Sequence, residues 1–223
     1  NSYLLSAIVF MPLLGALSMA LFKSDKPKFY HWLAAFWTGL TLVLSLFLLG
    51  SFSHTPPTTG QGFQFLDRLP WIPEFNIYYQ VGVDGLSMPM VLLTALLLFL
   101  AVFISWKTDD RARMYFAMLL IMETGVLGVF SSLDLFLFFT MWELELIPMY
   151  FLIGLWGGPR REYAAIKFIL YTMLASALML IAFLVIYFQS APQTFDLLVL
   201  MQNKNSLLAG MAPAMQMAVF LGL

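Results

Sequence analysis

The sequence contains no cysteine and very little charge. Without cysteine, the chain has no disulfide, no thiolate metal ligand and no cysteine nucleophile. Charged residues make up only 10% of its 223 residues, whereas a soluble domain carries roughly 25%. That charge is too small to cover a water-facing surface. Together with a hydrophobic content of 61% and a mean hydropathy of +0.88, it predicts an integral membrane protein.

Other features are also scarce, and each scarcity excludes a class of function. The net charge of −1 argues against electrostatic binding of nucleic acid. The only two histidines, His31 and His54, both lie near predicted loops, which argues against a histidine-based metal site. The sequence has no phosphate-binding loop, dinucleotide fingerprint or metal-ligand cluster. We therefore expect no cofactor here, and no direct binding of NADH, flavin or an iron–sulfur centre.

Long apolar runs dominate the rest of the sequence. A spanning helix needs about 20 mostly apolar residues. Six such runs predict an all-α bundle of transmembrane helices, at residues 3–22, 31–50, 86–106, 114–130, 133–156 and 163–188. A truncated seventh run begins near Leu207, and the longest loop, predicted to be external, covers 51–85. Because the sequence starts at Asn1 and stops at Leu223 inside an apolar run, we interpret it as a fragment, with a retained first span rather than a signal peptide.

The basic residues predict the orientation of the bundle. In the order of the loops they are Lys23, Lys26 and Lys28; Arg68; Lys107, Arg111 and Arg113; none; Arg160 and Arg161; Lys204. The loops rich in Lys and Arg therefore alternate with poor ones. The positive-inside rule places the rich loops in the cytoplasm and the N-terminus outside.

Three ionisable residues fall inside predicted spans. Glu143, in the stretch MWELELIPMY, lies about 15 Å into the fifth span, and Glu123 about 14 Å into the fourth. Lys167 lies roughly 7 Å into the sixth span from its cytoplasmic edge. Burying such a group costs about 2.5–3.5 kcal/mol on insertion scales, so it usually lines a wet path or pairs with another group. These residues favour an ion or proton relay, and the alternative is that neutral carboxyls hold helices together by hydrogen bonds.

Neighbouring residues refine this interpretation. Glu143 and Glu145 differ by about 200° around a helix, so they should point to nearly opposite sides. Pro148 removes the backbone donor for the Leu144 carbonyl, which would give water access to this turn, although membrane helices also tolerate proline without such a role. At the helix ends, Asp84 and Asp134 are predicted N-caps.

Three longer stretches resemble a known family. Residues 69–97, 128–158 and 163–172, with the signature W-E-x-x-L-[IV]-P-M-Y-F-L-I, are similar to the antiporter-like subunit M of bacterial complex I, the proton-pumping NADH-quinone oxidoreductase. The resemblance implies a fourteen-helix fold. Residues 1–113 would be its first three helices and 114–223 the first part of a proton-translocating repeat. It also implies that Glu143 pairs with a lysine on a broken seventh helix, expected after the last residue, and that Lys167 belongs to the family's A-A-x-K-F segment.

The function implied by this resemblance is proton translocation coupled to quinone reduction in other subunits. The implied partners are other membrane-arm subunits, lipid, protons and water, in the inner membrane of a bacterium. Two alternatives remain at this point. One is a subunit of an Mrp-type Na⁺/H⁺ antiporter or of a membrane-bound hydrogenase, which share the fold. The other, of a different class, is a membrane scaffold that transports nothing.

Overall fold

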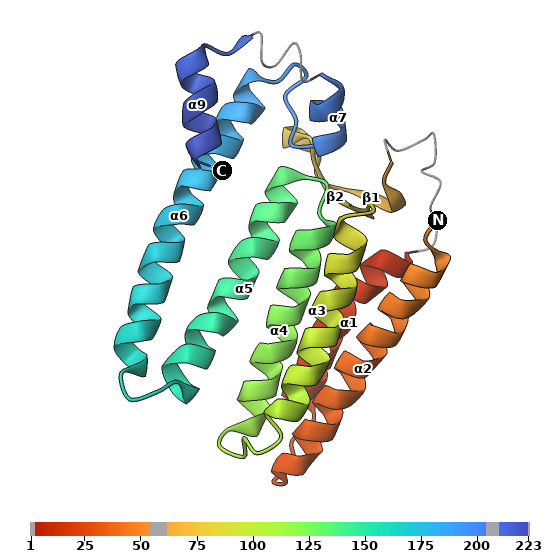
Figure 1. Cartoon of the computed structure of the whole chain (residues 1–223), viewed down its shortest axis with the longest axis vertical. Coiled ribbons are helices and arrows are strands. Elements are labelled where there is room, and N and C mark those ends of the chain that lie inside the picture. The colour runs from red at the N-terminus through yellow and green to blue at the C-terminus, as the bar shows by residue number, and fades with distance from the viewer. Residues whose placement is uncertain (1–2, 54–61, 204–209, 223) are drawn as a thin grey trace.

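The computed structural model describes residues 3–53, 62–203 and 210–222 and has six helices long and apolar enough to cross a membrane (Figure 1). They are α1 (Leu4–Leu21), α2 (Pro27–Ser51), α3 (Ser87–Ile104), α4 (Ala112–Ser131), α5 (Leu135–Trp156) and α6 (Arg161–Gln189). Each matches one predicted span, which confirms the predicted bundle of transmembrane helices. The largest difference is at α2, which begins four residues early because Pro27 is well suited to the first turn of a helix.

The chain after α6 differs more from the prediction. A short helix, α7 (Leu197–Gln202), is capped by Asp196, whose side chain accepts hydrogen bonds from the backbone N–H groups of Leu198 and Val199. A second helix, α9 (Pro213–Gly222), runs beside α6, where a Cβ on Gly222 would lie 3.2 Å from the Ala182 Cβ (Figure 1). The predicted start near Leu207 lies outside the described residues, as do His54 and Lys204.

The predicted external loop at 51–85 needs a correction, because it contains a β-hairpin. Strands β1 (Gln64–Ile72) and β2 (Ile77–Val83) pair antiparallel, with Arg68 opposite Gln80. A 3₁₀ turn, η1 (Pro73–Phe75), joins them and ends at Asn76, which adopts the left-handed conformation with φ of 53°. The prediction missed the hairpin because β1 shows no clean alternation of apolar and polar residues, which is the usual signal of a strand.

The hairpin lies across one end of the helical bundle, which we call the hairpin end (Figure 1). Neighbouring strand residues point to opposite faces, so Asp67 and Arg68 contact different parts of the molecule. Asp67 accepts a hydrogen bond of 2.7 Å from the Ser6 hydroxyl of α1. Arg68 lies 3.2 Å from the carboxylate of Asp196. On β2, the Tyr78 backbone N–H donates to Asp134 at the start of α5.

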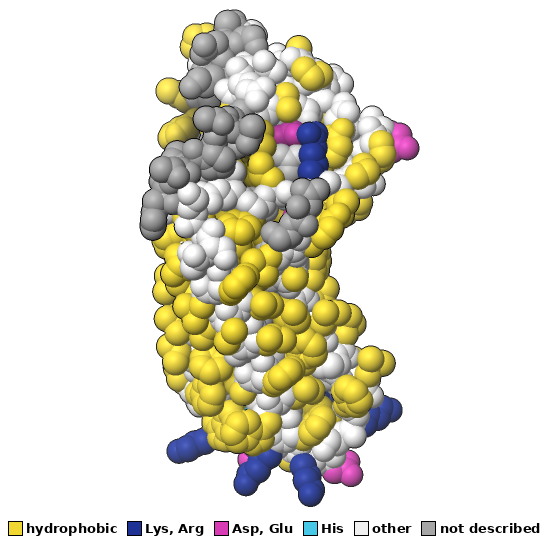
Figure 2. Space-filling model, turned by 90° about the vertical axis from the view of Figure 1, so that its right-hand side faces the viewer, with side chains coloured by type: hydrophobic (Ala, Val, Ile, Leu, Met, Phe, Trp, Pro, Cys, Tyr) yellow, Lys and Arg dark blue, Asp and Glu magenta, His cyan; other side chains and the backbone are white. Residues whose placement is uncertain are grey.

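The opposite end of the bundle is basic. Figure 2 shows Lys and Arg side chains gathered at this end, below a belt of hydrophobic side chains. We call it the basic end. Some of these cations close helix ends: Arg113 donates to the Met19 carbonyl at 2.7 Å and to the Ala20 carbonyl, and Arg161 donates to the Leu155 carbonyl at 2.7 Å. They satisfy carbonyl groups that a helix leaves unpaired at its C-terminus.

Two apolar clusters fill the bundle formed by α1–α4, and the first of them also includes residues of β2 and α5. The hairpin-end cluster comprises Leu5, Ile8, Val9, Leu48, Val81, Val83, Met88, Val91, Leu127, Leu137 and Met141. The basic-end cluster comprises Ala16, Met19, Tyr30, Ala34, Ala35, Val102, Ala112, Phe116, Leu119 and Leu120. A third cluster, which includes Met179 and Phe183, packs α6 against Phe138 and Trp142 of α5.

Candidate functional site

Glu143 lies close to the middle of α5, roughly 12 Å from the hairpin end of that helix. Its side chain is partly buried. The atom Oε1 is fully buried and has no hydrogen-bond partner among the described residues. Because a buried oxygen without a donor is costly, this oxygen needs a hydrogen-bond donor such as a water molecule or a further polar side chain.

The two glutamates of the motif lie on different faces of α5. A Cβ on Gly125 of α4 would be 3.0 Å from the Cβ of Glu145, so Glu145 lies at the contact between α4 and α5. Glu143 is turned by about 200° from Glu145 and therefore faces away from α4. Its neighbour Trp142 packs in the cluster that joins α5 and α6.

Glu123 is fully buried, and neither of its carboxyl oxygens has a hydrogen-bond partner among the described residues. It lies roughly 12 Å from the hairpin end of α4, so Glu123 and Glu143 are at a similar level, as predicted. They do not face each other. Helix α4 contacts α5 through Gly125 and Gly128, whereas Glu123 continues the α4 face of Leu119 and Leu120, which packs against α1, α2 and α3.

Lys167 is exposed on α6, close to the basic end. Its Nζ atom lies 5.8 Å from the ring centroids of both Tyr163 and Tyr171. The same residues line an open depression of about 510 Å³. Within the described part of the chain, no hydrogen bond or ion pair joins any two of Lys167, Glu143 and Glu123.

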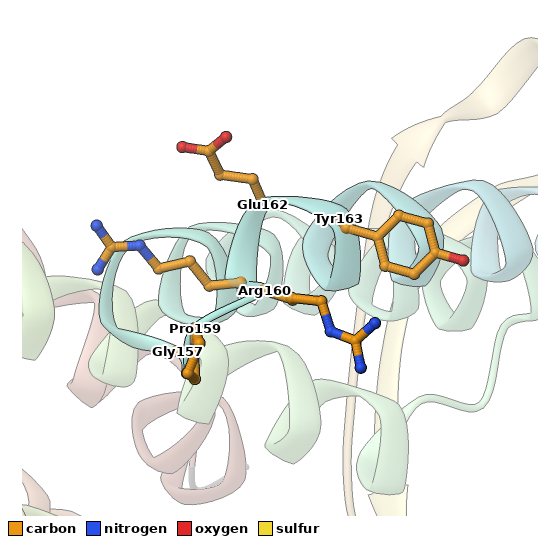
Figure 3. Close-up of a pocket in the computed structure, with 7 residues that line it drawn as sticks. Gly157, Pro159, Arg160, Glu162 and Tyr163 are labelled. Carbon is orange, nitrogen blue, oxygen red and sulfur yellow. The ribbon is translucent and has the colours of Figure 1, made fainter.

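A larger open depression, of about 760 Å³, lies at the turn between α5 and α6 (Figure 3). It is lined by residues 157–163, and Figure 3 shows Glu162 and Tyr163 pointing to different sides of the first turn of α6. Neither Glu143 nor Glu123 lines it. This depression is a feature of the basic surface and not of the candidate proton site.

The structure confirms that Asp134 caps α5 but corrects the predicted N-cap at Asp84, because α3 begins at Ser87 and its N-cap position is therefore Leu86. Asp134 accepts hydrogen bonds from the N–H groups of Phe136 at 2.9 Å and Leu137 at 3.1 Å, and burial raises the pKa of its carboxyl. Asp84 accepts from the Leu86 N–H at 3.1 Å and from the Ser87 N–H, at the first residue of α3, at 2.7 Å. Burial acts to raise the pKa of Asp84, but these hydrogen bonds outweigh it and lower that pKa.

Sequence reasoning missed two groups of polar residues. One is the hairpin-end network of Arg68, Gln80 and Asp196, in which the Gln80 side chain donates to Asp196 at 3.2 Å. The other is a set of buried hydroxyls that includes Thr38 and Thr41 on α2. The buried threonines could have been found from their helical spacing in the sequence. The network could not, because it joins positions far apart in sequence. In the described ranges, no three His, Cys, Asp or Glu side chains group as metal ligands.

Comparisons with known proteins agree with this architecture. The family described as NADH:quinone oxidoreductase/Mrp antiporter, TM, matches residues 132–223. Chain 4 of a NAD(P)H-quinone oxidoreductase from Nostoc sp. is 39% identical over 193 residues, covering 86% of this chain and 35% of that protein. The chloroplast chain 4 of Chara vulgaris is 41% identical over 187 residues, covering 84% and 37%. The chain therefore spans about a third of the length of these relatives.

Solved structures show the same fold. A chain of respiratory complex I from Thermus thermophilus with bound NADH has a TM-score of 0.78 at 28% identity, covering 98% of this chain and 42% of that one. A chain of the Mrp complex from Dietzia sp. has a TM-score of 0.76 at 15% identity, covering 99% and 22%, which shows the fold alone.

The helices, the carboxyls at mid-depth and these matches define a multi-pass, antiporter-like membrane subunit. The chain belongs to the NADH:quinone oxidoreductase/Mrp antiporter transmembrane family, and the predicted resemblance to subunit M of complex I is confirmed.

Proposed function

We propose that this chain is part of a proton-translocating membrane subunit of a bacterial NADH-quinone oxidoreductase and that Glu143 takes up and releases the transported proton. The observation that carries this proposal is the position of Glu143. It lies at mid-depth on α5, faces away from α4, and has one carboxyl oxygen buried without a partner in the described residues. The names of the relatives support a quinone oxidoreductase in preference to an antiporter that works alone.

The proposed mechanism is electrostatic. When ionised, Glu143 would hold a partner lysine in its charged form, and we expect this lysine on the broken seventh helix that the family resemblance implies. A unit charge pair at about 4 Å is worth roughly 4 kcal/mol at an effective dielectric constant near 20. Protonating Glu143 would remove that attraction and release the lysine's proton along a hydrated path. Redox chemistry would belong to other subunits.

The other two predicted residues take part in the same proposal. Glu123 would hold a second proton within the α1–α4 bundle. Lys167 would carry positive charge near the basic end, where proton exchange with the cytoplasm would take place. The basic end would face the cytoplasm and the N-terminus would lie outside, following the distribution of Lys and Arg.

The test is Glu143→Gln in the full-length subunit within its assembled complex. We expect quinone-linked proton translocation in vesicles to fall by at least tenfold while the complex still assembles. The matched control is Glu145→Gln, two residues away on the face that contacts α4. A scaffold would tolerate both changes. Equal translocation in wild type and Glu143→Gln would contradict the proposal, and sodium–proton exchange without quinone would favour the Mrp-type alternative.

A further inference from the structure

We propose that a layer of buried polar side chains in α1–α4 binds ordered water around Glu123. This layer would form a hydrated proton-holding site on the side of α4 that faces away from α5. The inference deepens the role proposed above for Glu123. It does not depend on whether Glu143 carries the transported proton.

The layer is defined by the two apolar clusters that enclose it. On α4, Glu123 follows Leu120 of the basic-end cluster and precedes Leu127 of the hairpin-end cluster. On each of the other three helices, buried residues likewise lie between members of the two clusters, although α1 and α3 run in the opposite direction. Apart from Gly15, Ala95 and Gly125, the buried residues that lie between the clusters are Pro12 on α1, Thr38, Thr41 and Ser45 on α2, Thr94 on α3, and Glu123 and Thr124 on α4. Polar side chains thus interrupt an otherwise apolar core.

Three of these residues lie at one level of the bundle. Helices α2 and α4 both begin at the basic end, and Thr38 and Glu123 each lie roughly 16 Å from those starts. Helix α3 runs in the opposite direction, and Thr94 lies roughly 15 Å before its last residue, Ile104. Since α4 packs against both α2 and α3, the geometry brings two hydroxyl groups to the level of the carboxyl.

The hydrogen bonds of the layer are incomplete. Thr38 donates to the Ala34 carbonyl at 3.0 Å, and Thr94 donates to the Met90 carbonyl at 2.8 Å, so each hydroxyl has used its only proton. Their lone pairs can still accept. Pro12 has no N–H, so the Ile8 carbonyl cannot receive the usual helical bond from that position. The layer therefore has acceptors in excess and too few donors.

Glu123 itself adds to this shortage of hydrogen-bond donors. It is 0% exposed, both oxygens lack a partner among the described residues, and no ion pair of that part of the chain includes it. A buried carboxyl without a cation is favoured in its neutral form, which offers one O–H donor and needs a donor for its other oxygen.

Water is the ligand that fits this chemistry. A buried water typically makes about three hydrogen bonds to groups that would otherwise be unsatisfied. It supplies two donors where the layer lacks them, and its oxygen accepts from the Glu123 O–H group. Leaving such groups unpaired costs more than immobilising a water molecule.

The direct test is a map of the full-length subunit in its complex that resolves ordered water elsewhere in the membrane. We expect water density within hydrogen-bonding distance of the Glu123 carboxyl and the Thr38 hydroxyl. If the same map shows water at other depths and none in this layer, the proposal is wrong.

A spectroscopic test uses the carbonyl stretch of protonated Glu123, assigned by its loss in Glu123→Gln. Thr38→Val keeps the side-chain shape and removes one hydroxyl, so we expect it to shift the band to higher frequency. The matched control is Ser131→Ala on the same helix as Glu123, because the Ser131 hydroxyl donates to the Leu127 carbonyl at 2.8 Å outside the layer. That control should leave the band in place.

An unshifted band in Thr38→Val would overturn the proposal, as would the absence of any protonated Glu123 band. Both outcomes are independent of the transport assay on Glu143→Gln. A failure of the proposed function would therefore be distinguishable from a failure of this inference.

Discussion

The guanidinium of Arg68 lies 3.2 Å from the carboxylate of Asp196 and joins the hairpin to the cap of α7. The two partners differ sharply in environment, because the Arg68 side chain is 50% exposed and that of Asp196 only 2%. Asp196 also accepts hydrogen bonds from the backbone of Leu198 and Val199 and from Gln80. This carboxylate is therefore the centre of the hairpin-end network.

The asymmetry predicts unequal effects of mutation. Asp196→Ala removes a helix cap and a buried acceptor, and should lower the free energy of unfolding by about 2 kcal/mol. Arg68→Ala removes a half-exposed partner and should cost less than about 1 kcal/mol. Thermal unfolding in lipid nanodiscs would measure both, with exposed Lys107→Ala as the control. A larger effect from Arg68→Ala would mean that the ion pair, and not the cap, stabilises this end.

Gly128 predicts a steric limit at the contact between α4 and α5. A Cβ at this position would lie 2.6 Å from the Met141 sulfur, so Gly128→Val should separate the helices and cost about 2–3 kcal/mol. Gly50 on α2 has no atom within 4 Å of its Cβ position, and Gly50→Ala should be neutral or stabilising by up to about 1 kcal/mol. Denaturation of the two variants side by side would measure the contrast. Equal stability would show that Met141 moves aside freely.

Asp134 predicts a dependence of stability on pH. Burial, the largest cause, raises the pKa of its carboxyl in the folded state above the ordinary value of 3.8. The folded state therefore holds this proton more tightly than the unfolded state. Its contribution to stability is complete below pH 3.8 and is lost as pH rises through the folded-state pKa. Asp134→Asn keeps an acceptor for the helix cap and cannot ionise, so unfolding temperature should decline less with pH across that window.

Asp84 provides the opposite control. Its pKa is lowered in the folded state, despite burial, by the hydrogen bonds with Ser87 and Leu86. Its contribution is therefore present above the ordinary value of 3.8 and lost as pH falls through the folded-state pKa. Asp84→Asn should remove stability at neutral pH, where Asp134→Asn should not. Parallel pH profiles for the two variants would contradict both assignments.

Lys167 predicts a separation between stability and transport. Its side chain is exposed and makes no ion pair within the described residues, so Lys167→Gln should change the free energy of unfolding by less than about 0.5 kcal/mol. If its charge assists proton exchange as proposed, translocation should fall, but less than in Glu143→Gln. Vesicle assays would compare it with Lys107→Gln. A loss as complete as in Glu143→Gln would require direct contact between Lys167 and Glu143, which this structure does not contain.

Much of the fold could be predicted from local sequence alone. The six spans follow from the length of each apolar run, because the backbone of a spanning segment must satisfy its own hydrogen bonds and does so as a helix. The cap at Asp134 follows from a side chain placed just before an apolar run. The depths of Glu123 and Glu143 follow from counting residues along their helices. None of these features depends on a distant contact.

The sequence by itself therefore determined a six-span membrane bundle with carboxyls at mid-depth. Only the tertiary structure decided which way those carboxyls face, because that depends on which side of each helix packs against a neighbour. In the folded chain Glu123 faces the interior of the α1–α4 bundle, Glu143 faces away from α4, and Lys167 lies exposed on α6. The tertiary structure also formed the hairpin and the network around Asp196, whose partners come from segments that no local pattern relates.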